Sequence, residues 1–168
     1  MRSRAGLGLI ILAVLALDQC SKILASSNMV VGESIPIVPG LFHITLVLNS
    51  GMAFGLLSAA AIPYKSALMT LLSIAAFGAV AAYAVSSPAS ERMSRLALAF
   101  ILGGAVGNII DRVRLGYVVD FIDVFYKGSH WPAFNVADSA ICAGVGLLLL
   151  DTLRRPENAT ATPSVGDS

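Results

Sequence analysis

Apolar residues are gathered into four long blocks along the chain, separated by shorter polar stretches. An α-helix rises about 1.5 Å per residue, so about 20 apolar residues cross the roughly 30 Å hydrocarbon core of a bilayer. The blocks have about this length and therefore predict four membrane-spanning helices. The expected spans are residues 5–25, 62–85, 96–113 and 133–150.

The pattern changes between the first and second spans. Phe42-His-Ile-Thr-Leu-Val-Leu-Asn49 has apolar residues at alternate positions, which is the period of a β-strand. Pro36 and Gly40 interrupt the stretch before it, and Asn49-Ser-Gly51 predicts a turn. Open sheet edges are not tolerated in hydrocarbon, so we expect a small β element outside the membrane, within residues 29–58.

Composition agrees with a mainly α-helical integral membrane protein. Of the 168 residues, 57% are hydrophobic and only 12% are charged, whereas soluble domains carry about 25% charged residues. We expect a single membrane-embedded domain over residues 1–155 and a disordered polar tail over residues 156–168. The net charge of +1 and the lack of a dense basic patch argue against a nucleic-acid partner.

The cysteines do not indicate a metal site or a disulfide framework. Cys20 and Cys142 each fall in an expected span, outside any zinc-ligand spacing, and we expect them to be small buried side chains. We expect no metal and no cofactor. The apolar run ending at Cys20 resembles a lipoprotein signal peptide, but Asp18 and Gln19 stand where cleavage requires small residues, so we interpret the run as a span.

Two carboxylates stand in strongly apolar sequence in a protein where acids are scarce. Asp120 and Asp138 are 138 − 120 = 18 residues apart, too far to be neighbours on one helix. Gly128 and Pro132 lie between them and allow the chain to turn back. An Asp at mid-bilayer depth costs about 2.5–3.5 kcal/mol, so two such acids suggest one functional site.

Four antiparallel spans place the polar residues of the chain on one membrane face. The opposite face holds the termini and residues 86–95. Of the eleven Lys and Arg residues, six lie on the terminal side and five on the other, which slightly favours cytoplasmic termini. The polar residues on the shared face are Asp18, Lys22, Asn49, Asn108, Asp111, Arg112, Asp120, Asn135 and Asp138.

Two close carboxylates tend to share one proton, because both cannot ionise cheaply. The ionised acid can then take a proton from water while the protonated acid donates a hydrogen bond to a carbonyl oxygen, as in aspartic proteases. Asn108, Asn135 and Arg112 supply donors that could hold a peptide backbone or the developing charge. This chemistry needs no metal, histidine or covalent nucleophile.

The residues alone leave other interpretations open. Acid pairs in membranes also serve proton relays and ion transport, and a polar cluster can be purely structural. Asp18 and Lys22 could form an i,i+4 ion pair that snorkels to the interface. Asp138 could belong to a capping box with Asn135. Asp123 is interpreted as a solvated acid.

Five segments, in matching order and spacing, resemble the bacterial lipoprotein signal peptidases (signal peptidase II). Together they cover nearly the whole chain apart from the tail. The segments are Leu17-Asp-Gln-Cys-Ser-Lys22, Asn49-Ser-Gly-Met-Ala-Phe-Gly55, Gly103-Gly-Ala-Val-Gly-Asn108-Ile-Ile-Asp-Arg112, Val118-Val-Asp120-Phe-Ile122 and Phe134-Asn-Val-Ala-Asp138-Ser.

The resemblance implies an aspartyl dyad, Asp120 and Asp138, near the outer membrane surface, beside an extracytoplasmic β element. It places Asp18, Lys22 and Asp111 in support of the site. The residues that it assigns to substrate binding and its surroundings are Asn49, Gly51, Asn108, Arg112 and Asn135.

The resemblance also implies the partners. The substrates would be prolipoproteins that carry a diacylglyceryl group on a cysteine and are cut just before that residue. Cyclic peptide antibiotics such as globomycin would occupy the site. We expect a monomer in contact with membrane lipid, located in the bacterial cytoplasmic (inner) membrane, with cytoplasmic termini and an active site towards the extracytoplasmic face.

Overall fold

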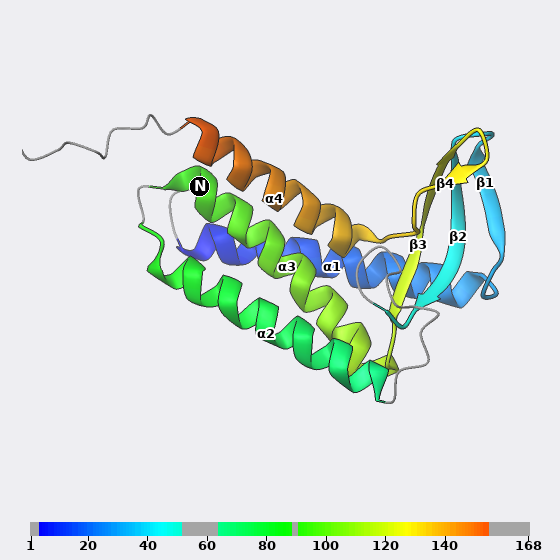
Figure 1. Ribbon diagram of the computed structural model, residues 1–168, viewed down its shortest axis with the longest axis horizontal. Helices are drawn as coiled ribbons and strands as arrows, with labels where there is room; N and C mark the ends of the chain where they lie inside the picture. Colours follow the sequence, from blue (N-terminus) through cyan, green and yellow to red (C-terminus); the bar gives the residue numbers. More distant parts are fainter. Residues whose placement is uncertain (1–3, 52–63, 89–90, 155–168) are drawn as a thin grey trace, which may run out of the picture.

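The computed structural model describes residues 4–51, 64–88 and 91–154. In this part of the chain, four helices run beside one another and a small sheet stands at one end of them (Figure 1). This confirms the predicted fold class, four spanning helices with a small β element. The helices are α1 (Arg4–Asn28), α2 (Lys65–Ser86), α3 (Arg92–Leu115) and α4 (Val136–Arg154), and the strands are β1 (Ser34–Val38), β2 (Phe42–Asn49), β3 (Val118–Tyr126) and β4 (Ser129–His130).

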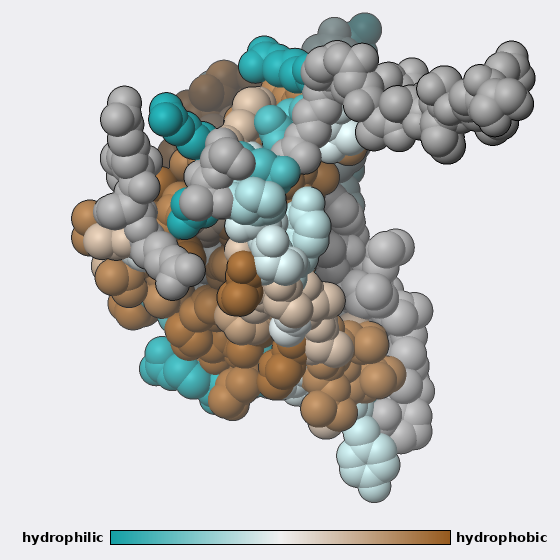
Figure 2. Space-filling model, turned by 90° about the vertical axis from the view of Figure 1, so that its left-hand side faces the viewer, coloured by the Kyte–Doolittle hydropathy of each residue, from teal (hydrophilic) through white to brown (hydrophobic). Residues whose placement is uncertain are grey.

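All four helices are long and apolar enough to cross a membrane. Their outward-facing side chains include Leu9, Leu71 and Leu149, which are 60 to 65% exposed. Figure 2 views the molecule from the end at which α4 finishes and shows hydrophobic side chains over a large part of that surface. Such exposure of large apolar side chains is costly in water and favourable in lipid.

The expectation that the two cysteines are buried is wrong. Cys20 on α1 and Cys142 on α4 are both exposed. A membrane-spanning helix can turn a small, weakly polar thiol towards lipid at little cost, because hydrocarbon does not penalise apolar exposure as water does. Hydropathy therefore identified the spans but not their buried sides.

α3 is the central helix and packs against α1, α2 and α4. Its glycines allow this close approach: a Cβ at Gly103 would lie 3.0 Å from Val14 Cβ of α1, and one at Gly104 would lie 2.4 Å from the Ala137 carbonyl oxygen of α4. Glycine at these two positions therefore lets α1 and α4 approach α3 closely. Small residues at helix contacts are the usual means of close packing in membranes.

The sheet is antiparallel, in the order β1-β2-β3-β4. β2 matches the alternating pattern, whereas β3 and β4 were not predicted, although Val118–Tyr126 is rich in the β-branched and aromatic residues that favour strands. A small core of Ala25, Leu46, Val119 and Phe121 joins the sheet to the end of α1.

Two helices begin at residues other than those expected from the sequence. α4 begins at Val136 rather than at residue 133, because Phe134 pairs with Ile122 of β3. α3 begins at Arg92, before the expected residue 96. The start of the second expected span, residues 52–58 of the expected β region and the tail at 156–168 lie outside the described residues.

The contact between α3 and α4 gives a test of the packing. A Cβ at Gly144 would lie 2.6 Å from the Ala97 carbonyl oxygen, so Gly144→Ala should lower the free energy of unfolding by about 1–3 kcal/mol. Gly146 on the same helix has no atom within 4 Å of its Cβ position, so Gly146→Ala should be neutral or stabilising, by up to about 1 kcal/mol. Thermal unfolding in detergent would measure both, and equal effects would contradict the packing.

Candidate active site

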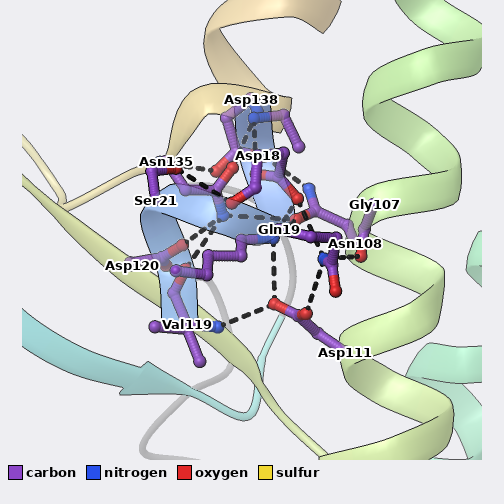
Figure 3. A network of polar contacts seen from close by, with 12 residues as sticks. Asp18, Gln19, Ser21, Gly107, Asn108, Asp111, Val119, Asp120, Asn135 and Asp138 are labelled. Atoms are coloured by element: carbon purple, nitrogen blue, oxygen red, sulfur yellow. Dashed lines mark hydrogen bonds and ion pairs between the residues drawn. The ribbon is translucent and has the colours of Figure 1, made fainter. Parts of the chain in front are cut away.

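The polar residues of α1, α3, β3 and α4 converge beside the sheet (Figure 3). Asp120 lies on β3, and Asp138 lies in the first turn of α4. The two segments are joined directly: Ile122 N–H donates to the Phe134 carbonyl oxygen at 2.8 Å, and Phe134 N–H donates back to the Ile122 carbonyl oxygen at 3.1 Å. The structure thus brings together the two acids that the sequence placed 18 residues apart.

Three asparagine amides hold the two carboxylates. Asn49 Nδ2 donates to Asp120 Oδ2 at 2.9 Å, and Asn135 Nδ2 donates to Asp120 Oδ1 at 2.7 Å. Asn108 Nδ2 donates to Asp138 Oδ1 at 2.8 Å. These fixed donors set the orientation of both carboxylates without neutralising them.

The capping box that was an alternative role for Asp138 is present. Asn135 Oδ1 accepts the Asp138 N–H at 2.9 Å, and Asp138 Oδ2 accepts the Asn135 N–H at 3.4 Å. This reciprocal pair begins α4 and fixes the direction in which Asp138 points. It engages only one carboxylate oxygen of Asp138, so capping and a role in chemistry are compatible.

The environment of Asp120 brings its pKa close to neutral pH. Its exposed fraction is 1%. Burial, followed by the neighbouring charge of Asp138, raises the pKa of Asp120 to about 7, while the hydrogen bonds from Asn49 and Asn135 and the charge of Lys22 act in the opposite direction. A pKa near the working pH is what acid–base chemistry requires.

Lys22 lies at the centre of a buried charge cluster. Its Nζ is 2.9 Å from Asp18 Oδ2 and 2.9 Å from Asp111 Oδ2, and it donates to Asn108 Oδ1 at 2.9 Å. Lys22 is 3% exposed and Asp18 is 0% exposed. The alternative of an interfacial pair that snorkels to the surface is therefore wrong, because both groups are buried and Lys22 joins α1 to Asp111 of α3.

The two carboxylates of this cluster also anchor the elements that carry the acid pair. Asp18 Oδ1 accepts the Ala137 N–H at 2.9 Å, and Asp111 Oδ2 accepts the Val119 N–H at 3.2 Å. Ala137 and Val119 each precede one acid of the pair by a single residue. The cluster therefore positions the backbone from which Asp138 and Asp120 project.

Gln19 belongs to the same network and was not predicted as a site residue. Its Nε2 lies 3.1 Å from Asp111 Oδ1, 3.2 Å from Asp18 Oδ2 and 3.3 Å from the Gly107 carbonyl oxygen. A Cβ at Gly107 would lie 2.4 Å from Asp18 Oδ2, so a side chain at this position would have to displace the Asp18 carboxylate. The available signal was a lone amide next to Asp18 in an apolar span.

A cavity of about 390 Å³ between α2, α3 and α4 reaches this network. Among the described residues, its polar lining consists of Asn49, Ser73, Asn108, Arg112 and Asp138, and most of the rest is apolar. The lining does not include Asp120. Asp138 therefore faces the cavity, while Asp120 lies behind Asn49.

Arg112 and Gly51 meet at the edge of the cavity. Arg112 Nη2 donates to the Gly51 carbonyl oxygen at 3.2 Å. The Gly51 N–H donates to Asn49 Oδ1 at 2.9 Å, which confirms the predicted turn and leaves the Asn49 amide nitrogen directed at Asp120. Gly51 thus contributes backbone groups that orient two side chains of the site.

Asp123 is not the solvated acid that was expected. It is 8% exposed, accepts a hydrogen bond from Thr45 Oγ1 at 3.0 Å and lies 2.8 Å from His130 Nδ1. These contacts link β2, β3 and β4 through side chains.

Among the described residues, no group of three or more His, Cys, Asp and Glu side chains is placed to hold a metal ion.

Replacing Lys22, the cation of the buried cluster, with a neutral residue should strongly destabilise the protein. Lys22→Met would leave Asp18 and Asp111 facing each other without a counter-charge, so the free energy of unfolding should fall by about 3–5 kcal/mol. Lys127→Met is the control: Lys127 is exposed, and its removal should change stability by less than about 0.5 kcal/mol. Thermal unfolding in detergent measures both, and a loss of less than about 1 kcal/mol for Lys22→Met would contradict the anchoring role.

Known proteins share this sequence and this fold. The family described as Signal peptidase (SPase) II matches residues 10–154. The lipoprotein signal peptidase of Geobacter metallireducens is 48% identical over 140 residues, which are 83% of this chain and 85% of that protein. The lipoprotein signal peptidase of Janthinobacterium sp. is 47% identical over 146 residues, 86% of this chain and 87% of that protein.

Two solved structures, both described as bacterial membrane enzymes, have the same fold. One matches with a TM-score of 0.82 at 30% identity, over 94% of this chain and 93% of that chain. The other matches with a TM-score of 0.81 at 28% identity, over 92% of this chain and 98% of that chain. The resemblance seen in the sequence is confirmed, and the chain belongs to the signal peptidase II family.

Proposed function

We propose that this protein is an aspartic endopeptidase that removes signal peptides from prolipoproteins, cutting just before a diacylglyceryl-modified cysteine. Family membership supports peptidase activity on lipoprotein precursors. The observation that carries the aspartic mechanism is the arrangement of Asp120 and Asp138, held in one network by three asparagine amides beside a cavity.

The acids take different roles because their surroundings differ. Asp138 lines the cavity and acts in its ionised form, taking a proton from a water molecule that attacks the peptide carbonyl carbon. Asp120, with a pKa of about 7, holds the proton of the pair and donates a hydrogen bond to the carbonyl oxygen. The proton taken from water then passes to the leaving nitrogen, and the C–N bond breaks.

Asp120 is buried and hydrogen-bonded to Asn49, so it can reach a substrate only after a local rearrangement. Asp120 is 1% exposed, and Asn49 both lines the cavity and donates to Asp120. We infer that the scissile carbonyl group displaces the hydrogen bond between Asn49 and Asp120. The freed Asn49 amide then donates to the substrate backbone, while Arg112 stabilises the developing negative charge.

The walls of the cavity fit a substrate that arrives from the membrane. Met69, Leu72 and Phe77 of α2 and Ile141 of α4 line it with apolar surface. An apolar signal helix can enter sideways between α2 and α4 while the acyl chains of the modified cysteine remain in lipid. The scissile bond then lies at the level of the sheet, where water is available.

The location follows from the same proposal. The protein is a multi-pass protein of the bacterial inner membrane, with its termini in the cytoplasm and its sheet and acid pair towards the extracytoplasmic face. It acts as a monomer with membrane lipid around it. Cyclic peptides such as globomycin are expected to compete with the substrate for the cavity.

Substitution of either acid tests the assignment. Asp120→Asn and Asp138→Asn should each lower kcat by at least about 10³-fold, because the pair can no longer activate water. Asp123→Asn on the same strand as Asp120 is the matched control and should cut at close to the wild-type rate. The measurement is cleavage of a diacylglyceryl-modified prolipoprotein in detergent, with folding of each variant confirmed. Folded Asn variants that still cut would show that the chemistry lies elsewhere.

The pH dependence tests the division of roles. Below about pH 7 Asp120 keeps its proton and the pair carries one proton. Above that pH both carboxylates ionise, so kcat/KM should fall with a midpoint near pH 7, by about tenfold per pH unit at higher pH. Initial rates from pH 5 to 9 give the profile, and Asp123→Asn should share it. A rate that is constant across this range would contradict a proton held on Asp120.

A further inference from the structure

A second groove lies at the other end of the helices from the acid pair. Its volume is about 630 Å³, and it lies between the beginning of α1, the end of α2 and the beginning of α3. The lining is mostly apolar, with Leu7, Ile11 and Leu98 among its residues. Because α2 packs chiefly against α3 among the helices, the space between α2 and α1 is left open.

Among the described residues that line this groove, Arg95 is the only charged one. It is half-buried, and its guanidinium group has no hydrogen-bond or ion-pair partner among the described residues. The first turn of α3 contains no acidic residue. A cation against apolar surface is unfavourable unless an anion accompanies it.

The position of Arg95 selects the kind of anion. The groove is formed by helix ends, so Arg95 lies near the membrane surface while the apolar lining continues towards the interior. A molecule that complements this arrangement has one anionic group attached to a hydrocarbon chain. Arginine is suited to phosphate because its planar guanidinium donates two parallel hydrogen bonds.

We propose that this groove binds an anionic phospholipid of the leaflet on the side of the chain termini. The phosphate binds Arg95, and one acyl chain lies along α1 and α2 against Leu7 and Ile11. This site is separate from the cavity at the acid pair, and its existence does not depend on the peptidase mechanism.

Thermal unfolding in detergent, with added phosphatidylglycerol or phosphatidylcholine of the same acyl chains, tests the proposal. A ligand that binds only the folded state raises the unfolding midpoint. Phosphatidylglycerol should raise the midpoint of the wild type by about 3 °C or more beyond the effect of phosphatidylcholine. Arg95→Gln should abolish this difference. Arg92→Gln, an exposed arginine in the same helical turn and outside the groove, should keep it.

A second pair of variants tests the acyl-chain part without touching the arginine. Gly8 lines the groove and has no atom within 4 Å of its Cβ position, so Gly8→Leu fills the groove without a clash near its backbone. It should abolish the preference for phosphatidylglycerol. Gly78 on α2 also has no atom within 4 Å and lies outside the groove, so Gly78→Leu should keep the preference.

The opposite results would overturn the proposal. Equal stabilisation of the wild type by the two lipids would mean that the groove holds ordinary boundary lipid. An Arg95→Gln variant that keeps the preference would rule out the arginine as the phosphate site. If Gly8→Leu slows cleavage of a prolipoprotein but keeps the lipid preference, the groove receives peptide instead. Gly8→Leu decides the question if Arg95→Gln does not fold.

Discussion

The buried contact of Lys22 with Asp18 and Asp111 is the interaction on which the rest of the site depends. Burying three charges is expensive, and apolar residues could replace them at no cost to stability alone. Their contribution is to position the backbone on either side of the acid pair. Each carboxylate accepts the backbone N–H of the residue before one acid of the pair, Ala137 or Val119. The lysine on α1 therefore helps to set the distance between β3 and α4, which the bond from Asn135 to Asp120 and the pairing of Phe134 with Ile122 also join.

The same lysine fixes the direction of the amide groups around the acids. Lys22 has donors only, so Asn108 must turn its oxygen towards Lys22 and its nitrogen towards Asp138. Asn135 is oriented in the same way: its oxygen accepts the Asp138 N–H, and its nitrogen faces Asp120. Donated hydrogen bonds favour the ionised carboxylate, whereas burial favours the protonated one. At Asp120 these opposed effects leave the pKa at about 7, within the range useful for proton transfer.

The sequence indicated the parts of this site that follow from local pattern. Four apolar blocks predicted the helices, and the rarity of acids in apolar sequence singled out Asp120 and Asp138. Strands β3 and β4 were missed because strand pairing is non-local: β3 becomes a strand by pairing with β2, whose residues lie 69 to 82 positions earlier in the chain. The spacing of Asp18 and Lys22 fitted a surface pair as well as a buried one, because only Asp111 on another helix decides between them. Hydropathy could not place Cys20 or Cys142, since lipid and protein interior are both apolar.

The uneven packing of α2 explains how an apolar substrate can meet a reaction that consumes water. α2 packs mainly against α3. One space remains between α2 and α4 near the acid pair, and another remains between α2 and α1 at the end of the helices where the chain termini lie. Water would fill such apolar spaces at a cost in a soluble protein, whereas hydrocarbon chains fill them in a bilayer. The polar residues of the first space gather at the end next to the sheet, where Asn49, Asn108 and Asp138 line it. A substrate can therefore remain in lipid along most of α2 and be exposed to water only at the bond to be cut.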